Sequence, residues 1–226
     1  MGEPGASETA IKLWDLPVRL VHWSFVLSIP ALWWTAEEGN LELHQTIGYV
    51  MLALVLFRLI WGVIGSSTAR FASFVRGPGA VLRYLRGASG DPIVGHNPVG
   101  AVSVLLLLTL LLAQTGLGLF ALNEDMDGGP LSYLVSYEAA DLAREVHEIG
   151  FNMILALVVI HIAAIAWYRL VKRDDLITPM VTGKRAYETA VEAPTIAPWW
   201  RALVSAAVAG GIAYWISLGA PLPGGG

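Results

Sequence analysis

Residues 146–169 read VHEIGFNMILALVVIHIAAIAWYR, a long apolar run that contains two histidines, His147 and His161. The two histidines are 14 residues apart, which is about 21 Å along an α-helix and returns to nearly the same face. Polar side chains at membrane depth are costly and usually face the interior of a helix bundle. The stretch therefore predicts a membrane helix that presents two imidazoles at two depths.

The composition is that of an integral membrane protein. Of the 226 residues, 55% are hydrophobic and only 14% are charged, whereas soluble domains carry about 25% charged residues. The sequence has no cysteine, which excludes disulfides, haem attached through C-x-x-C-H and thiolate-ligated iron–sulfur clusters. Residues 1–16 have no apolar core, so we expect a short cytoplasmic tail there and no cleavable signal.

Apolar runs predict the membrane spans. We expect four spans and a weaker fifth, over residues 17–36, 43–65, 98–122, 146–169 and 199–218. Pro17 suits the first turn of a helix, and Asn97 followed by Pro98 is a helix-start signal. The loop of residues 66–97 is expected to contain a short interfacial helix over residues 81–85, and residues 123–145 an acidic loop. We expect one bundle over residues 17–185, followed by a linker, a fifth helix and a Gly-rich tail over residues 186–226.

The basic residues predict the orientation. The links after the first and third spans contain one base between them, Arg144, while the loop of residues 66–97 and the segment of residues 170–198 hold most of the others. Because Lys and Arg stay on the cytoplasmic side, the N-terminus is expected inside. With five spans the C-terminus would be outside.

Four histidines then fall at two levels. His44 and His147 begin their spans at the outer end, whereas His22 and His161 lie towards the cytoplasmic end of theirs. Neutral imidazole suits iron, and two ligands at each of two levels suit a flat macrocycle held between helices. A zinc or copper site would gather three or four ligands at one level. The pattern therefore favours two bis-histidine haems, although a single histidine at a helix end is often only an interfacial residue.

Other polar residues receive secondary roles. Arg58 is 14 residues after His44 and shares its face, so we expect it either to contact a haem propionate or to extend to the membrane surface. His96 is expected to be a loop residue, or else a contact for a propionate or a quinone. Glu148 and Asn152 are candidates for hydrogen bonding around the ligands, or for packing. The leucine-rich third span is given no chemical role.

With these residues assembled, the chain resembles the bacterial di-haem cytochrome b family, which includes cytochrome b561 and the cytochrome b subunits of nickel–iron hydrogenases. The matching pieces are Trp14-Asp15 with Arg19-Leu-Val-His22-Trp23, His44-Gln-Thr-Ile-Gly48-Tyr49, Phe57-Arg58-Leu-Ile-Trp61-Gly62, Gly95-His96-Asn97-Pro98, His147, His161 and Met180-Val-Thr-Gly183-Lys184. The acidic loop and the fifth span lie outside this match.

The resemblance implies two b haems with ligands on the first, second and fourth spans, and electron exchange with a quinone. It makes Arg58, His96 and Trp61 candidates for contact with a haem propionate or a quinone. We therefore expect an all-α integral membrane protein of the bacterial inner membrane, with a four-helix transmembrane bundle that houses two b haems and a fifth C-terminal transmembrane helix.

The expected function is electron transfer between the quinone pool and a periplasmic redox partner, such as a c-type cytochrome or another redox subunit. The chain would act as a subunit or partner of a larger redox complex. Two alternatives remain open. One is a stand-alone quinone-linked oxidoreductase acting on a small periplasmic substrate such as superoxide, and the other is a non-redox membrane anchor with structural histidines.

Overall fold

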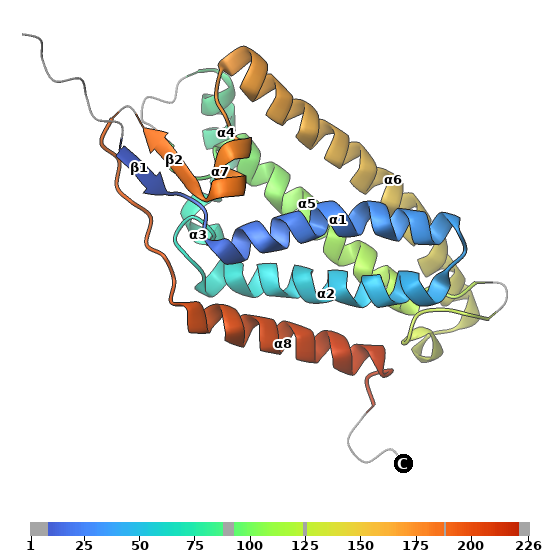
Figure 1. Cartoon of the computed structure of the whole chain (residues 1–226). Coiled ribbons are helices and arrows are strands. Elements are labelled where there is room, and N and C mark those ends of the chain that lie inside the picture. Colours follow the sequence, from blue (N-terminus) through green and yellow to red (C-terminus); the bar gives the residue numbers. More distant parts are fainter. Residues whose placement is uncertain (1–8, 88–92, 124–125, 188, 222–226) are drawn as a thin grey trace, which may run out of the picture.

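The computed structural model describes residues 9–87, 93–123, 126–187 and 189–221. Four of its helices are long and apolar enough to cross a membrane, and they pack side by side in a bundle (Figure 1). They are α1 (Leu16–Glu37), α2 (Leu41–Ile64), α5 (Pro98–Phe120) and α6 (Tyr137–Trp167). These helices confirm the predicted four-helix membrane bundle.

Side-chain caps start the helices where the sequence predicts. The Asp15 carboxylate accepts a hydrogen bond from the backbone N–H of Val18 at 2.8 Å, with Pro17 in the first turn of α1. Asn97 caps α5 by accepting from the N–H of Gly100 at 2.7 Å. Such caps satisfy N–H groups that have no partner within the helix.

Helix α6 begins earlier than expected. Ser136 caps it by accepting from the N–H of Ala139 at 3.3 Å, so residues 137–145 are helical rather than part of the predicted loop. Arg144 supports this turn by pairing with Asp141 at 2.7 Å and with Glu148 at 2.8 Å, a spacing that stabilises helices without any apolar pattern. With 31 residues, α6 is about 46 Å long and exceeds the hydrocarbon thickness of about 30 Å.

Short elements gather at one end of the bundle, beside the start of α1 (Figure 1). They are β1 (Thr9–Lys12), α3 (Phe71–Phe74), α4 (Pro78–Leu85), α7 (Ile177–Thr182) and β2 (Lys184–Tyr187). Helix α4 confirms the short helix predicted in the loop of residues 66–97. At the opposite end lies a single 3₁₀ turn, η1 (Ser132–Leu134).

The segment before α1 is built into the fold. Strand β1 pairs antiparallel with β2, with Thr9 opposite Tyr187 and Lys12 opposite Lys184. The backbone N–H of Leu13 donates to the carbonyl of Gly183 at 2.8 Å, and the apolar Leu13 and Trp14 are buried. Residues 9–15 therefore do not belong to a free tail, whereas residues 1–8 of the predicted tail lie outside the described residues.

Gly183 is required at this contact. Its φ of +82° is in the left-handed region, and a Cβ there would lie 2.9 Å from the carbonyl oxygen of Trp14. Any larger residue would force the two segments apart. This contact gives a physical reason for the two matched sequence motifs, around Gly183 and around Trp14, to occur together.

Helix α8 (Trp199–Ser217) lies along α2 and runs in the opposite direction (Figure 1). At one end Arg201 donates to the carbonyl of Ile64 at 3.1 Å, and at the other Tyr133 donates to the carbonyl of Gly219 at 2.8 Å. The buried residues of α8 are all small, which permits close helix packing; they are Ser205, Ala209 and Ala213. A helix lies where the fifth span was predicted, but α8 is not among the four described helices with the length and apolarity of a membrane span, so its crossing of the membrane stays a prediction.

Charge divides the bundle into two ends. Of the 14 lysine and arginine residues, only Arg144 lies at the end that carries the loop before α6. We call this the acidic end, and its described carboxylates are Glu37, Glu38, Glu42, Asp127, Glu138, Asp141, Glu145 and Glu148. The other end, with α3, α4, α7 and the two strands, is the basic end.

A layer of apolar side chains fills the middle of the bundle. Met51 and Val55 from α2, Leu111 from α5 and Ile154 from α6 are buried and pack together. Ile154 is seven residues from both His147 and His161, so it shares their face of α6 and lies about 10 Å from each along the axis. This apolar layer separates two polar levels of the bundle.

Candidate functional site

His44 on α2 and His147 on α6 lie side by side at the acidic end. Their ring centroids are 6.2 Å apart and the ring planes are inclined at 75°. The Nδ1 of His44 lies 3.0 Å from the carbonyl oxygen of Leu32, and the Nδ1 of His147 lies 2.9 Å from that of Gln114. Because a carbonyl only accepts, each Nδ1 carries the hydrogen and each Nε2 keeps a free lone pair.

This geometry fits a metal held between two imidazoles. With a metal–nitrogen distance of about 2 Å on each side, the two ring centroids would be about 6 Å apart, which agrees with the observed separation. A carbonyl partner at the other ring nitrogen is the usual way to fix the tautomer and orientation of a ligand histidine. Gly48 lies one turn after His44, and a Cβ there would meet no atom within 4 Å.

Helix α5 holds His147 by close contact. In addition to its carbonyl, Gln114 uses its side chain, whose Nε2 donates to the backbone carbonyl of His147 at 2.8 Å. A Cβ on Gly118 would lie 2.9 Å from Cε1 of the His147 ring, so only glycine lets the ring approach α5 this closely. The expectation that this helix has no chemical role is therefore wrong, because α5 positions the His147 ring. A glutamine within a leucine run was the available signal, because such a residue is costly in a membrane span.

His22 on α1 and His161 on α6 form the level nearer the basic end. The Nδ1 of His161 lies 3.5 Å from the hydroxyl of Ser103 on α5. The Nδ1 of His22 is buried and has no hydrogen-bond partner among the described residues. The apolar layer lies between this level and that of His44 and His147.

The candidate ligands in the described part of the bundle lie in pairs rather than in larger clusters. Within residues 9–87, 93–123, 126–187 and 189–221, no three histidine or carboxylate side chains come together as a metal site. The arrangement thus differs from the ligand sets of three or four that zinc favours. It suits a cofactor that supplies its own equatorial ligands and takes one axial ligand from each of two helices.

Arg58 is buried at the basic end, near the half-buried His96. The guanidinium of Arg58 lies 5.1 Å from the centroid of the Phe71 ring, and its Nη1 has no hydrogen-bond partner among the described residues. The His96 ring lies between Trp14 and Phe74, with centroid distances of 4.6 and 4.5 Å. Burial and the charge of Arg58 lower the pKa of His96 to about 3, so this imidazole is neutral.

Other candidates have structural partners. The indole N–H of Trp61 donates to the Asp15 carboxylate at 2.9 Å, which leaves Trp61 no donor for a propionate or a quinone. Glu148 pairs with Arg144 at the surface, and the side chain of Asn152 donates to the backbone carbonyl of Glu148. Glu148 and Asn152 therefore do not hydrogen-bond to the histidines, contrary to one expectation from the sequence.

Comparison with known proteins identifies the family. The model of the family described as prokaryotic cytochrome b561 matches residues 13–183, which include all four paired histidines. The chain belongs to the prokaryotic cytochrome b561 family. It is therefore an integral membrane b-type cytochrome that acts in electron transfer, and haem b is the cofactor of this family.

Several relatives have been named as probable Ni/Fe-hydrogenase B-type cytochrome subunits. One from Rhizobium leguminosarum bv. viciae is 21% identical over 83% of this chain and 93% of the relative. One from Azotobacter vinelandii is 24% identical over 80% of this chain and 90% of the relative, and one from Escherichia coli strain K12 is 22% identical over 78% and 91%. No solved structure gives a significant match to the chain.

Proposed function

We propose that this cytochrome holds two b haems and carries electrons across the bacterial inner membrane, between the quinone pool and a redox partner in the periplasm. The observation that supports this most strongly is the His44–His147 pair, with a ring separation of 6.2 Å and both Nδ1 atoms bonded to carbonyls. His44 and His147 would hold the outer haem, and His22 and His161 the inner one.

The haems would supply one-electron chemistry. Two histidines would hold each iron, a ligand set that favours electron transfer over reaction at the metal. The carbonyls of Leu32 and Gln114 hold the Nδ1 atoms of the outer pair, which would leave the Nε2 atoms free to bind the iron and would raise the basicity of the imidazoles. The apolar layer around Ile154 keeps water from passing between the two levels.

Arg58 and His96 would serve the inner haem. A buried guanidinium nitrogen without a partner is costly, and the carboxylate of a haem propionate would satisfy it with a charge-assisted hydrogen bond. The neutral His96 would bind either a propionate or the carbonyl oxygen of a quinone. We favour quinone exchange at this end because polar groups that can bind its oxygen atoms gather there.

The orientation follows from the charges. The basic end would face the cytoplasm and the acidic end the periplasm, which places the N-terminus inside. Helix α8 is joined to both ends of the bundle, through Arg201 and through Tyr133. We propose that it crosses the membrane beside α2, which would place the C-terminus in the periplasm.

The acidic end would bind the periplasmic partner. Its carboxylates would attract a basic redox protein such as a c-type cytochrome, or a basic surface of another redox subunit. The relatives named as hydrogenase cytochrome subunits support the proposal that this chain is a subunit or partner of a larger redox complex, such as a hydrogenase. Binding of the partner should weaken as salt concentration rises, and binding that is insensitive to salt would contradict this assignment.

A haem assay tests the proposal. The pyridine haemochrome of the purified protein should show two haems b per chain, and less than one would refute it. His147→Ala should remove the outer haem and His161→Ala the inner haem, each leaving the absorbance of the other largely intact. If either change removed no haem, the assignment of two ligand pairs would be wrong.

A further inference from the structure

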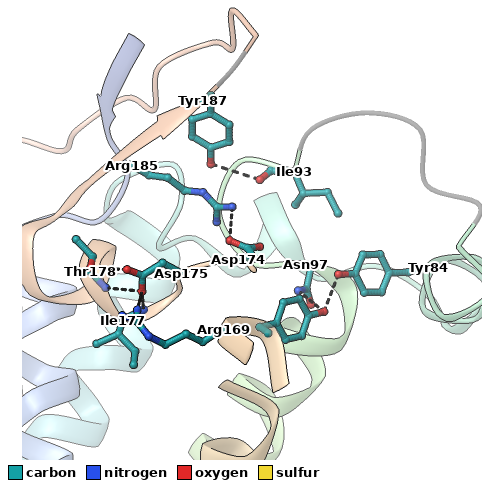
Figure 2. A network of polar contacts seen from close by, with 11 residues as sticks. Tyr84, Ile93, Asn97, Arg169, Asp174, Asp175, Ile177, Thr178, Arg185 and Tyr187 are labelled. Atoms are coloured by element: carbon teal, nitrogen blue, oxygen red, sulfur yellow. Dashed lines mark hydrogen bonds and ion pairs between the residues drawn. The ribbon is translucent and has the colours of Figure 1, made fainter. Parts of the chain in front are cut away.

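A polar cleft opens at the basic end, beside the N-terminus of α5, and Figure 2 shows the polar contacts around it. It has a volume of about 250 Å³ and is lined by residues that include Tyr84, Asn97, Asp174 and Arg185. Asp174 and Arg185 form an ion pair at 2.8 Å, and their side chains remain 32% and 24% exposed. The cleft therefore has an acid in contact with water at its mouth.

Two tyrosine hydroxyls lie next to Asn97, and one of them belongs to Tyr84, which lines the cleft. The hydroxyls of Tyr84 on α4 and Tyr168 at the end of α6 are 2.7 Å apart, and the side-chain amide of Asn97 donates to Tyr168 at 3.0 Å. Because each hydroxyl can donate and accept at once, the pair can pass a proton by rotating its O–H groups. Burial and the Tyr168 hydroxyl raise the pKa of Tyr84 above its usual range, so Tyr84 keeps its proton.

An irregular turn joins the mouth of the cleft to this pair. Tyr168 begins a π-helical turn, η2 (Tyr168–Lys172), and Arg173 follows it with a left-handed φ of 56°. The carbonyl of Tyr168 accepts from the N–H of Asp174 at 3.0 Å, so the chain returns Asp174 towards Tyr168. π-turns are rare and occur frequently at functional sites. Here the turn connects Tyr168 to Asp174, which lines the cleft.

The hydrogen-bonded pair leads towards the inner histidine level. Tyr168 is seven residues after His161, so it shares that face of α6 about 10 Å nearer the surface. On α5, Asn97 lies beside Tyr168 and Ser103 lies beside His161. Polar groups therefore follow the seam between α5 and α6 from the cleft into the bundle.

We propose that this cleft, with Asp174, Tyr84 and Tyr168, is the path by which protons from the aqueous phase reach a quinone reduced at the basic end. The inference rests on the proposed function, which supplies the quinone and the electrons. Reduction of one quinone takes two electrons from the redox partner and two protons, which form the two O–H bonds of the quinol. Each proton enters the cleft from the aqueous phase beside Asp174, and each hydroxyl passes one on as it receives another, so no residue is left changed.

A single-turnover experiment on the full-length protein with bound haem tests this path. The protein is reduced chemically, freed of reductant and mixed with decylubiquinone, and haem oxidation is followed by absorbance in H₂O and D₂O. Tyr168→Phe and Tyr84→Phe should slow oxidation by about tenfold or more, because a positioned proton donor commonly contributes at least that factor, and should increase the H₂O/D₂O rate ratio. Asp174→Asn should also slow the oxidation of the haem by decylubiquinone.

Controls separate proton transfer from electron transfer. Oxidation by ferricyanide, which takes up no proton, should keep its rate in every variant, and the haem spectrum should be unchanged. The side chain of Tyr214 on α8 is 67% exposed, so Tyr214→Phe should behave as the unmodified protein. If Tyr168→Phe fails to retain haem, Tyr84→Phe and Asp174→Asn decide the matter from the other side of the cleft.

The outcomes distinguish the two proposals. If quinone does not oxidise the unmodified protein, the proposed quinone reaction is wrong and the proton path falls with it. If quinone oxidises the unmodified protein and the three variants at the same rate and with the same isotope ratio, the proton path alone is refuted.

Discussion

Main-chain carbonyls orient the imidazoles at the acidic end. Leu32 on α1 binds His44 of the neighbouring helix α2, and Gln114 on α5 binds His147 on α6. His44 and His147 are thus each positioned by a helix other than their own. A backbone acceptor is present whatever the side chain, so these bonds depend on helix packing rather than on the identity of Leu32 or Gln114.

Gly118→Ala should disturb the outer site. The added Cβ would lie 2.9 Å from Cε1 of His147, so the ring must shift, and such overpacking costs about 1–3 kcal/mol. We expect a changed absorbance of the outer haem and a lower melting temperature. Gly211→Ala on α8 is the matched control, because a Cβ there meets no atom within 4 Å. An unaltered spectrum and melting temperature for Gly118→Ala would show that α5 does not fix the His147 ring.

His96 should make the protein less stable in acid. Its pKa is lowered to about 3 in the folded state, against about 6.5 in an unfolded chain. The unfolded state therefore binds more protons between these values, and the free energy of unfolding falls as pH drops through this range. Between pH 7 and pH 5 the loss would be about 2 kcal/mol.

Thermal melting checks this contribution. The melting temperature should fall between pH 7 and pH 5, and His96→Gln should reduce that fall, because glutamine has no proton to gain. An equal fall in the unmodified protein and in His96→Gln would mean that His96 does not cause the acid sensitivity.

Residue spacing predicted the histidines but not what surrounds them. The 14-residue interval between His147 and His161 sets their depths through helix geometry alone. The partners of the rings depend on how α1 and α5 pack against α2 and α6, which no local pattern states. Trp61 shows the same limit, because its partner Asp15 precedes it by 46 residues.

At the scale of elements, α8 depends on small side chains for its position. Ser205, Ala209 and Ala213 face α2, and close backbone approach compensates for the lack of a hydrophobic driving force between helices in lipid. The same helix contains Gly210 and Gly211. A Cβ on either glycine meets no atom within 4 Å, so neither makes the contact with α2.

Ala209→Leu should displace α8. Ala209 is 1% exposed, and three additional carbon atoms in a close helix contact would cost about 1–3 kcal/mol. We expect a lower melting temperature and faster proteolysis of the segment of residues 189–198 that precedes α8. Ala207→Leu, at an exposed position of the same helix, should have little effect. Equal behaviour of the two variants would show that the small face of α8 does not hold it against α2.

Element boundaries were predictable where a cap and an apolar pattern coincide. Helix α5 begins at the predicted Pro98 because Asn97 and the apolar run give the same start. Helix α6 begins at Tyr137 rather than at the predicted residue 146, because its first turns are held by Ser136 and by ion pairs in a polar stretch. An apolar pattern marks the part of a helix within lipid and does not mark its extension into water.

At the scale of the whole molecule, the two histidine levels are separated by the apolar layer of Met51, Val55, Leu111 and Ile154. The levels are about 21 Å apart in hydrocarbon about 30 Å thick. The proposed proton path at the basic end serves only the inner level and does not enter this layer. An electron that moves between the proposed haems would therefore cross the layer without a proton.

Electron distribution between the haems should consequently respond to voltage. Moving one charge across 100 mV involves about 2.3 kcal/mol, and the two levels span roughly two-thirds of the hydrocarbon. An imposed 100 mV should shift the equilibrium between the haems by about 1.5 kcal/mol, or roughly tenfold. Absorbance of half-reduced protein in vesicles with a potassium gradient and valinomycin would measure this, with His147→Ala as the control that has one haem. A distribution independent of voltage would mean that the layer admits compensating charge.

The apolar layer would separate the two proposed haems electrically. In the proposed orientation, and in a cell whose interior is negative, electrons moving from the acidic end to the basic end would work against the membrane potential, and those moving outwards would be driven by it. Quinone reduction at the basic end would then consume electrical energy in addition to the protons it takes up, whereas quinol oxidation there would release it. Four aliphatic and thioether side chains would, in this way, couple the redox balance of the protein to the energy state of the membrane.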